Sequence, residues 1–125
     1  MSSTSALEER LKELERRVPE IVASALVSSD GLMIASALRS EGDEERIAAM
    51  CAALVSVAER ISRELNKGRF EMGIIKGEKG YIITTNAGPD AVLITLTTSD
   101  AKLGLVFLEM KRAAEDLAKM LSGTS

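Results

Sequence analysis

The sequence has no histidine and no tryptophan, and it contains one cysteine, one tyrosine and two phenylalanines. Without histidine there is no Ser/His/Asp triad, no Cys/His pair and no histidine-ligated metal. A single cysteine allows neither an internal disulfide nor a zinc site built from cysteines, which fits a reducing cytosol. So few aromatic rings cannot stack successive bases of a single-stranded nucleic acid. The composition therefore disfavours most enzymes and nucleic-acid-binding proteins.

Strong charge and long apolar runs are also missing. The 125 residues carry 16 basic and 19 acidic side chains, a net charge of -3, so we expect no broad positive field for nucleic acid. No run approaches the ~18 apolar residues of a membrane span, and the polar first residues lack the apolar stretch of a signal peptide. We expect a cytoplasmic protein with one domain, residues 1–125, and an ordered core of about 5–121.

Periodicity and turn residues divide the chain into eight elements. Apolar residues at helical spacing predict a first helix that Pro19 ends, and Asp30-Gly31 between two apolar runs predicts a tight hairpin. Asp43 can cap a long second helix. The expected strands span residues 21–28, 32–37, 70–76, 81–86 and 91–97, and the expected helices span 5–18, 43–65 and a segment that follows residue 100 and ends near 121. This order predicts an α+β fold, with a five-stranded antiparallel sheet between helices.

The second helix is more apolar than an ordinary surface helix. Between Ile47 and Ala58 only Ser56 is polar, over about three turns. One face must lie on the sheet, and the opposite face stays in water unless another molecule covers it. Burial under the first or last helix is the alternative, but each of those helices has a single apolar stripe to bury on the other side of the sheet. We therefore predict a protein interface on this helix.

The third strand gives a second indication of an interface. It follows a crossing helix and precedes a meander, so we expect it at a sheet edge, where unpaired backbone groups can pair with another chain. The alternative is an edge protected by the flanking Arg69 and Lys76. Pairing with the same strand of a second copy would place two apolar helices side by side across a two-fold axis. We predict a homodimer whose interface contains Met50, Ala53, Leu54, Val57, Phe70, Met72 and Ile74.

Other candidate sites in the sequence are weak. Gly73, Gly77 and Gly80 match neither the dinucleotide fingerprint nor the P-loop, so we interpret them as turn glycines. The acidic residues near turns and helix starts lack the alternating spacing of a calcium loop. Cys51 lies in the apolar helix without a histidine to activate it, which favours a buried thiol. We predict no catalytic residue, no cofactor and no metal site.

The order of elements and the local sequence resemble the roadblock family, the dynein light chain roadblock type that also includes regulators of Ras-like GTPases. The matching stretches are residues 22–36, the alanine-rich helix from Ile47, and residues 103–114. Their joint order, from about Leu7 to Leu121, carries the resemblance. Longin and profilin-like folds have similar layers, but the Asp30-Gly31 hairpin and the start of the last helix favour roadblock.

The resemblance implies a three-layer sandwich with strand order 2-1-5-4-3, the long second helix on one face and the terminal helices on the other. It also implies dimers formed through the third strand and the second helix, whose paired helices make a platform for a small GTPase or a larger scaffold. On this platform we assign partner contacts to Arg46, Ala49, Ala52, Ser56, Glu59, Arg60 and Arg63.

The leading hypothesis is a non-catalytic homodimeric regulator or adaptor of a Ras-like small GTPase, with acceleration of GTP hydrolysis as one form of regulation. The chemistry would then belong to the GTPase, helped by positioning of its loops or by a donated arginine. Arg39, Arg46 and Arg69 lie near the expected platform, but surface solvation explains them and we assign none as catalytic. The alternative is a structural scaffold or motor light-chain subunit that leaves nucleotide turnover unchanged. A small-molecule sensing domain is a third hypothesis, for which alanine-rich packing gives little reason.

Overall fold

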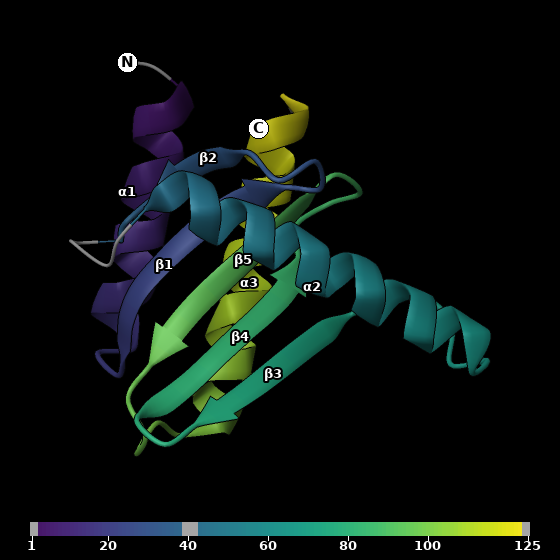
Figure 1. Cartoon of the computed structure of the whole chain (residues 1–125). Coiled ribbons are helices and arrows are strands. Elements are labelled where there is room, and N and C mark those ends of the chain that lie inside the picture. Colours follow the sequence, from purple (N-terminus) through teal and green to yellow (C-terminus); the bar gives the residue numbers. More distant parts are fainter. Residues whose placement is uncertain (1–2, 39–42, 124–125) are drawn as a thin grey trace.

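The computed structural model describes residues 3–38 and 43–123, and these form three layers (Figure 1). In chain order the elements are α1 (Ser3–Arg17), β1 (Ile21–Ser28), β2 (Met33–Ser36), α2 (Glu44–Glu64), β3 (Met72–Gly77), β4 (Gly80–Asn86), β5 (Ala91–Thr97) and α3 (Leu103–Ser122). The strands pair antiparallel in one sheet of order β2-β1-β5-β4-β3. α2 crosses one face, and α1 and α3 lie on the other. The expected α+β fold and strand order are confirmed.

Local sequence signals set most element boundaries. α1 ends before Pro19, whose ring cannot continue a helix. At the start of α2, the Asp43 carboxylate accepts hydrogen bonds from the backbone N–H groups of Glu45 and Arg46, at 3.0 and 3.4 Å. These bonds satisfy donors that the helix itself leaves free. In the turn between β1 and β2, Gly31 has a φ of 90°, which glycine adopts without a steric penalty. The predicted cap and hairpin are both confirmed.

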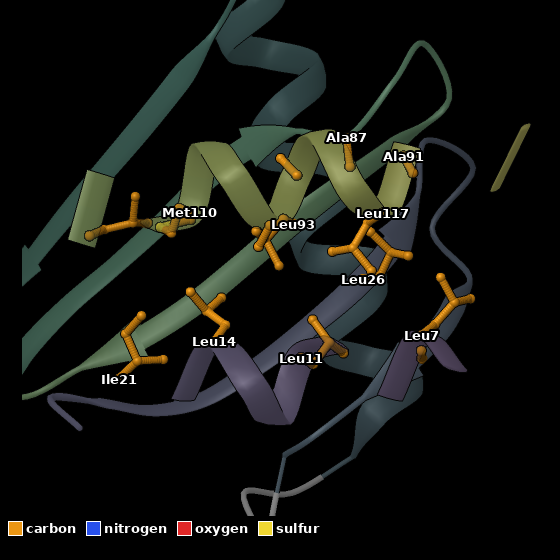
Figure 2. Packing of buried hydrophobic residues seen from close by; sticks show 14 of the residues in the cluster. Leu7, Leu11, Leu14, Ile21, Leu26, Ala87, Ala91, Leu93, Met110 and Leu117 are labelled. Atoms are coloured by element: carbon orange, nitrogen blue, oxygen red, sulfur yellow. The ribbon is translucent and has the colours of Figure 1, made fainter. Parts of the chain in front are cut away.

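The larger part of the core lies between the sheet and the α1/α3 layer. Figure 2 shows Leu11 and Leu14 of α1, Leu93 of β5, and Met110 and Leu117 of α3 within one cluster. All five side chains are fully buried. Fully burying a side chain of this size stabilises the fold by about 1.5–3 kcal/mol. This layer therefore supplies most of the apolar burial that holds the domain together.

The core on the α2 side is built from smaller side chains. Ala48 and Cys51 are the buried residues of α2. The strand residues that they pack with are Ala25 and Val27 of β1 and Val92 and Ile94 of β5. Since both helical layers cover them, β1 and β5 are buried on their two faces over most of their length. The small side chains under α2 bury less apolar area than the opposite cluster does.

The start of β3 differs from the predicted one. The strand begins at Met72, whereas the sequence predicted a strand from Phe70. The backbone N–H of Phe70 donates to Glu59 and its carbonyl accepts from Asn86, so neither group pairs with a strand. Its ring lies over Gly73, because a Cβ at Gly73 would lie 3.3 Å from the Phe70 Cζ atom. Side-chain hydrogen bonds have replaced strand pairing at this residue.

The other boundaries agree to within about two residues. α1 begins at Ser3 instead of Ser5, and β2 spans Met33–Ser36 instead of 32–37. Arg39 and the segment 40–42, which lies between the predicted second strand and second helix, are outside the described residues. Among residues 3–38 and 43–123, no helix is both long and apolar enough to cross a membrane.

Candidate functional site

α2 covers the sheet with only part of its length. Its buried residues, Ala48 and Cys51, belong to its first half, and the helix packs on β1 and β2. In Figure 1 its C-terminal turns extend past the ribbon of the sheet on the side of β3. A helix that leaves its supporting sheet exposes more than one face to water. α2 is therefore a core element at one end and a free surface at the other.

Large apolar side chains follow one line along the free surface of α2. They recur at positions 50, 54, 57 and 61, a spacing that puts them on one face of a helix, and continue into the C-cap residue 65. This apolar stripe consists of Met50, Leu54, Val57, Ile61 and Leu65, which are between 37% and 67% exposed. Contiguous exposed apolar surface of this kind is typical of a protein interface.

β3 is the second component of the site, and it lies at the edge of the sheet. Within the described residues it pairs with β4 alone, so the backbone groups along its outer side have no strand partner. Ile74 and Ile75 are 48% and 42% exposed. Ile74 pairs with Ile83, which is buried on the α3 side, whereas Ile75 pairs with Ile82, which packs on the α2 side. The edge strand therefore exposes apolar surface on both faces of the sheet.

A groove of about 770 Å³ separates the apolar stripe from β3. Leu54, Ile61 and Leu65 form its helical wall, and residues 70–75 form its strand wall. We call it the β3 groove. Because an exposed helix stripe, a groove and an unpaired strand edge are continuous here, one partner could cover all three.

The seven residues predicted for the dimer interface fall into three groups. Met50, Ala53, Leu54 and Val57 are exposed on α2, as the prediction requires. Met72 is half-buried and Ile74 is exposed at the β3 edge. Phe70 is only 6% exposed and already packs within its own chain, so the structure does not support it as an interface contact.

Sequence reasoning missed three exposed apolar residues of the same surface. Ile61 and Leu65 continue the apolar stripe, and Ile75 faces α2 from the strand. The spacing of the stripe could have revealed Ile61, since it continues the intervals of 4 and 3 residues beyond Val57. Ile75 gave no such signal, because two adjacent isoleucines in an edge strand point to opposite faces.

The residues predicted for partner binding lie along the other flank of α2. Arg46, Ala49, Ser56, Arg60 and Arg63 are exposed, and Ala52 and Glu59 are half-buried. Four of them line a second groove, of about 590 Å³, between α2 and the turn that joins β4 to β5. We call it the Arg63 groove. Its α2 wall contains Ala52, Val55, Ser56, Glu59 and Arg63, and its other wall contains Ser29, Arg69, Asn86, Pro89, Ala91 and Val92.

Glu59 links α2 to the segment before β3. One of its carboxylate oxygens accepts from Nε of Arg63 at 2.5 Å, and the other accepts from the backbone N–H of Phe70 at 3.1 Å. The hydrogen bond from Arg63, aided by that from Phe70 and by the positive charges of Arg63 and Arg69, holds the pKa of Glu59 below its ordinary value. Glu59 is therefore ionised at neutral pH, and both its oxygens are already engaged.

The arginines on this flank differ in whether their charge is neutralised. Arg60 pairs with Glu64 at 2.6 Å, and Arg63 pairs with Glu59. Of the eight arginines among the described residues, Arg46 and Arg69 are the two without an ion pair. These two guanidinium groups are available to a partner.

The single cysteine has no reactive environment. Cys51 is buried, and this burial raises the pKa of its thiol to about 11. It stays protonated at neutral pH and serves as a small apolar side chain. Within the described ranges, no group of three or more Cys, Asp or Glu side chains is placed to hold a metal ion.

The family model that matches this chain is the Roadblock/LC7 domain, over residues 7–97. The chain belongs to the Roadblock/LC7 family. The uncharacterized protein MJ1340 of Methanocaldococcus jannaschii is 40% identical over 100 residues, which cover 80% of this chain and 87% of the relative. MglB of Myxococcus xanthus has the same fold, with a TM-score of 0.88 at 22% identity over 98% of this chain and 92% of its own. A structure of MglB with a tetrameric arrangement gives a TM-score of 0.85 at 24% identity, over 96% of this chain and 90% of its own.

The match to the roadblock domain includes the whole of the site. Residues 7–97 contain α2, β3 and every residue that lines either groove. α3 lies outside the match and lines neither groove. The exposed stripe and the free edge thus lie within the part of this chain that matches the Roadblock/LC7 domain.

Proposed function

We propose that this roadblock protein is a non-catalytic homodimer that regulates or tethers a Ras-like small GTPase through the α2 helices of the dimer. The observation that carries the proposal is the apolar stripe on α2 beside the unpaired edge of β3. A cytoplasmic location, which the sequence predicted, is part of the same proposal.

The shape of that surface supports a dimer. If two β3 edges pair antiparallel about a two-fold axis, each strand gains the hydrogen-bonding partner that it lacks and the sheet becomes continuous. The same operation brings the two apolar stripes together, because each stripe lies beside its own β3 across the β3 groove. The tetrameric arrangement of a solved MglB supports self-association by this fold.

The GTPase would use the flank of α2 that such a dimer leaves open. Arg46, Ala49, Ser56, Arg60 and Arg63 are exposed on the side of α2 away from the β3 groove. The roadblock family to which the chain belongs includes regulators of Ras-like GTPases, which supports a GTPase as the partner. We assign the hydrolytic chemistry to the GTPase and its bound nucleotide, and to this chain only the binding and orientation of that partner.

The decisive experiment is single-turnover GTP hydrolysis by a Ras-like GTPase encoded near this protein, measured with and without the roadblock protein. Binding with a changed hydrolysis rate would establish a regulator, and binding with an unchanged rate would establish an adaptor. The absence of both binding and a rate change would contradict the proposal. Recovery of a defined non-GTPase partner, bound through α2, would support the structural scaffold instead.

A further inference from the structure

The side chains that line the Arg63 groove present more hydrogen-bond donors than free acceptors, and more positive than negative charge. Its lining contains two arginines and one glutamate, and both oxygens of that glutamate, Glu59, already accept hydrogen bonds. The hydroxyl groups of Ser29 and Ser56 are on exposed residues of the same lining. The groove therefore carries a net positive charge on a chain whose overall charge is -3.

Arg69 is held in place although its side chain is free. The residue before it, Gly68, accepts a hydrogen bond from Oγ of Ser62 at 2.8 Å. The residue after it, Phe70, is fixed at its N–H by Glu59 and at its carbonyl by Nδ2 of Asn86, at 2.6 Å. Arg69 thus stands between two anchored residues, so a partner that binds it orders one side chain but no loop.

Among the described residues, no acidic side chain near Arg69 forms an ion pair with it. Glu59 is engaged by Arg63, and Arg69 is not within ion-pair distance of it. Glu71, the next acidic residue in the sequence, lines the β3 groove, which Arg69 also borders, but it forms no ion pair with Arg69. Asp90 follows Pro89 of the lining but is exposed and does not itself line the groove. Arg69 is exposed and has no ion pair within the described residues, so its charge is available to a partner.

We propose that the Arg63 groove binds a partner segment that carries a carboxylate, and that Arg69 is the residue that pairs with this carboxylate. Arg63 supplies its remaining N–H groups, and Ala52, Val55, Ala91 and Val92 supply an apolar floor. The occupant is an acidic side chain flanked by apolar ones. This inference names the chemistry by which the partner of the proposed function is recognised. It rests on the proposed function only for the assumption that the partner binds this flank of α2.

The test uses the full-length protein, labelled with ¹⁵N, and two capped peptides as probes. One peptide contains leucine and glutamate, and its twin has glutamine in place of each glutamate. We expect the glutamate peptide to shift the NMR signals of Arg69, Ser56 and Asn86 and to bind more tightly than its twin. Arg69→Gln should weaken the glutamate peptide by roughly tenfold, as expected for loss of a charge-assisted hydrogen bond. Lys67→Gln, which removes an exposed cation from the β3 groove, should have no effect.

Several outcomes would overturn the inference. Equal binding of the two peptides, no loss with Arg69→Gln, or shifts confined to the β3 groove would each exclude a carboxylate site at Arg69. A halved mass for Arg69→Gln in light scattering would show that Arg69 belongs to the dimer contact. The peptide test and the GTPase test can fail independently. If the glutamate peptide binds but no GTPase does, the proposed function is wrong and the carboxylate site stands. If a GTPase binds but the peptide does not, the carboxylate site is wrong and the proposed function stands.

Discussion

The backbone N–H of Phe70 donates a hydrogen bond to the Glu59 carboxylate at 3.1 Å, across a gap of eleven residues. This bond ties the segment that enters β3 to the middle of α2. The same carboxylate holds Arg63, so one side chain positions the strand wall of the β3 groove and an arginine of the Arg63 groove. The surface proposed for dimerisation and the surface proposed for partner binding therefore share one positioning side chain, Glu59.

Replacing Glu59 tests this connection through pH. The folded-state pKa of Glu59 is depressed, so its stabilising contribution is present above the ordinary value of 4.5 and is lost as the pH falls through the lower folded-state pKa. Glu59→Gln should therefore lower the melting temperature at pH 7 but match the unaltered protein in strongly acidic buffer. Thermal unfolding between pH 7 and pH 3 measures the difference. A gap between the two proteins that stays constant with pH would contradict this assignment.

Gly80 is predicted to tolerate no side chain. A Cβ atom at Gly80 would lie 1.9 Å from the carbonyl oxygen of Thr97, and the residue has a φ of 152°. Gly80→Ala must shift the backbone of β4 or of β5, which we expect to cost about 3 kcal/mol or more of unfolding free energy. Gly77→Ala is the matched control in the same hairpin, because its Cβ would meet its nearest neighbour at 3.5 Å. Urea unfolding of both variants measures the difference in unfolding free energy. Equal urea midpoints for the two variants would contradict the expectation.

Charge on the apolar stripe or on the β3 edge should break the proposed dimer without unfolding the chain. Val57→Asp and Ile74→Lys alter side chains that are 58% and 48% exposed, so the folded protomer tolerates them. Each should weaken dimerisation by roughly 2 kcal/mol or more, as truncation of a central interface contact does. Multi-angle light scattering at micromolar concentration should show half the mass of the unaltered protein.

The control for these variants lies on the opposite layer. Leu108→Asp alters an α3 side chain that is 46% exposed, on the face of the sheet away from α2. It should leave the mass unchanged. A dimer that survives Val57→Asp and Ile74→Lys, or an unaltered protein that is already monomeric, would remove the proposed interface.

Phe70 should act on stability and not on assembly. Its side chain is 6% exposed and packs over Gly73 beside Thr84. Phe70→Ala leaves a cavity between α2 and the sheet edge, and we expect a loss of about 3 kcal/mol of unfolding free energy. Chemical denaturation gives this value, and Phe70→Leu should lose less because it fills most of the volume. If Phe70→Ala instead left stability unchanged and halved the mass, Phe70 would be an interface residue after all.

Most of the fold could be predicted because its signals are local. Asp43 caps the N–H groups of Glu45 and Arg46, and Asp30-Gly31 turns the chain within two residues, so each signal acts over a few positions. The bounds of α2, predicted as 43–65 and found as Glu44–Glu64, follow from such signals. The strand order came with the roadblock resemblance and not from the residues alone.

The wrong prediction for the start of β3 has a different origin. Phe70 alternates with Met72 and Ile74 as a strand residue would, but Glu59 and Asn86, 11 and 16 residues away, capture its backbone groups. No local pattern contains that information. The orientation of α2 is a similar case, because a run of apolar residues does not show that Ala48 and Cys51 are the ones turned towards the sheet.

The unequal support of α2 along its length makes the helix a reporter of assembly. Its first half is held by the Asp43 cap and by the buried Ala48 and Cys51, whereas the turns that carry Val57 and Ile61 contain no buried residue. In a lone protomer the backbone amides of these turns would exchange with deuterium through local fraying alone. In the proposed dimer the same amides should exchange more slowly, because the helix pair must separate before these turns can open. Hydrogen exchange along this one helix would therefore report the stability of the domain at one end and that of the complex at the other.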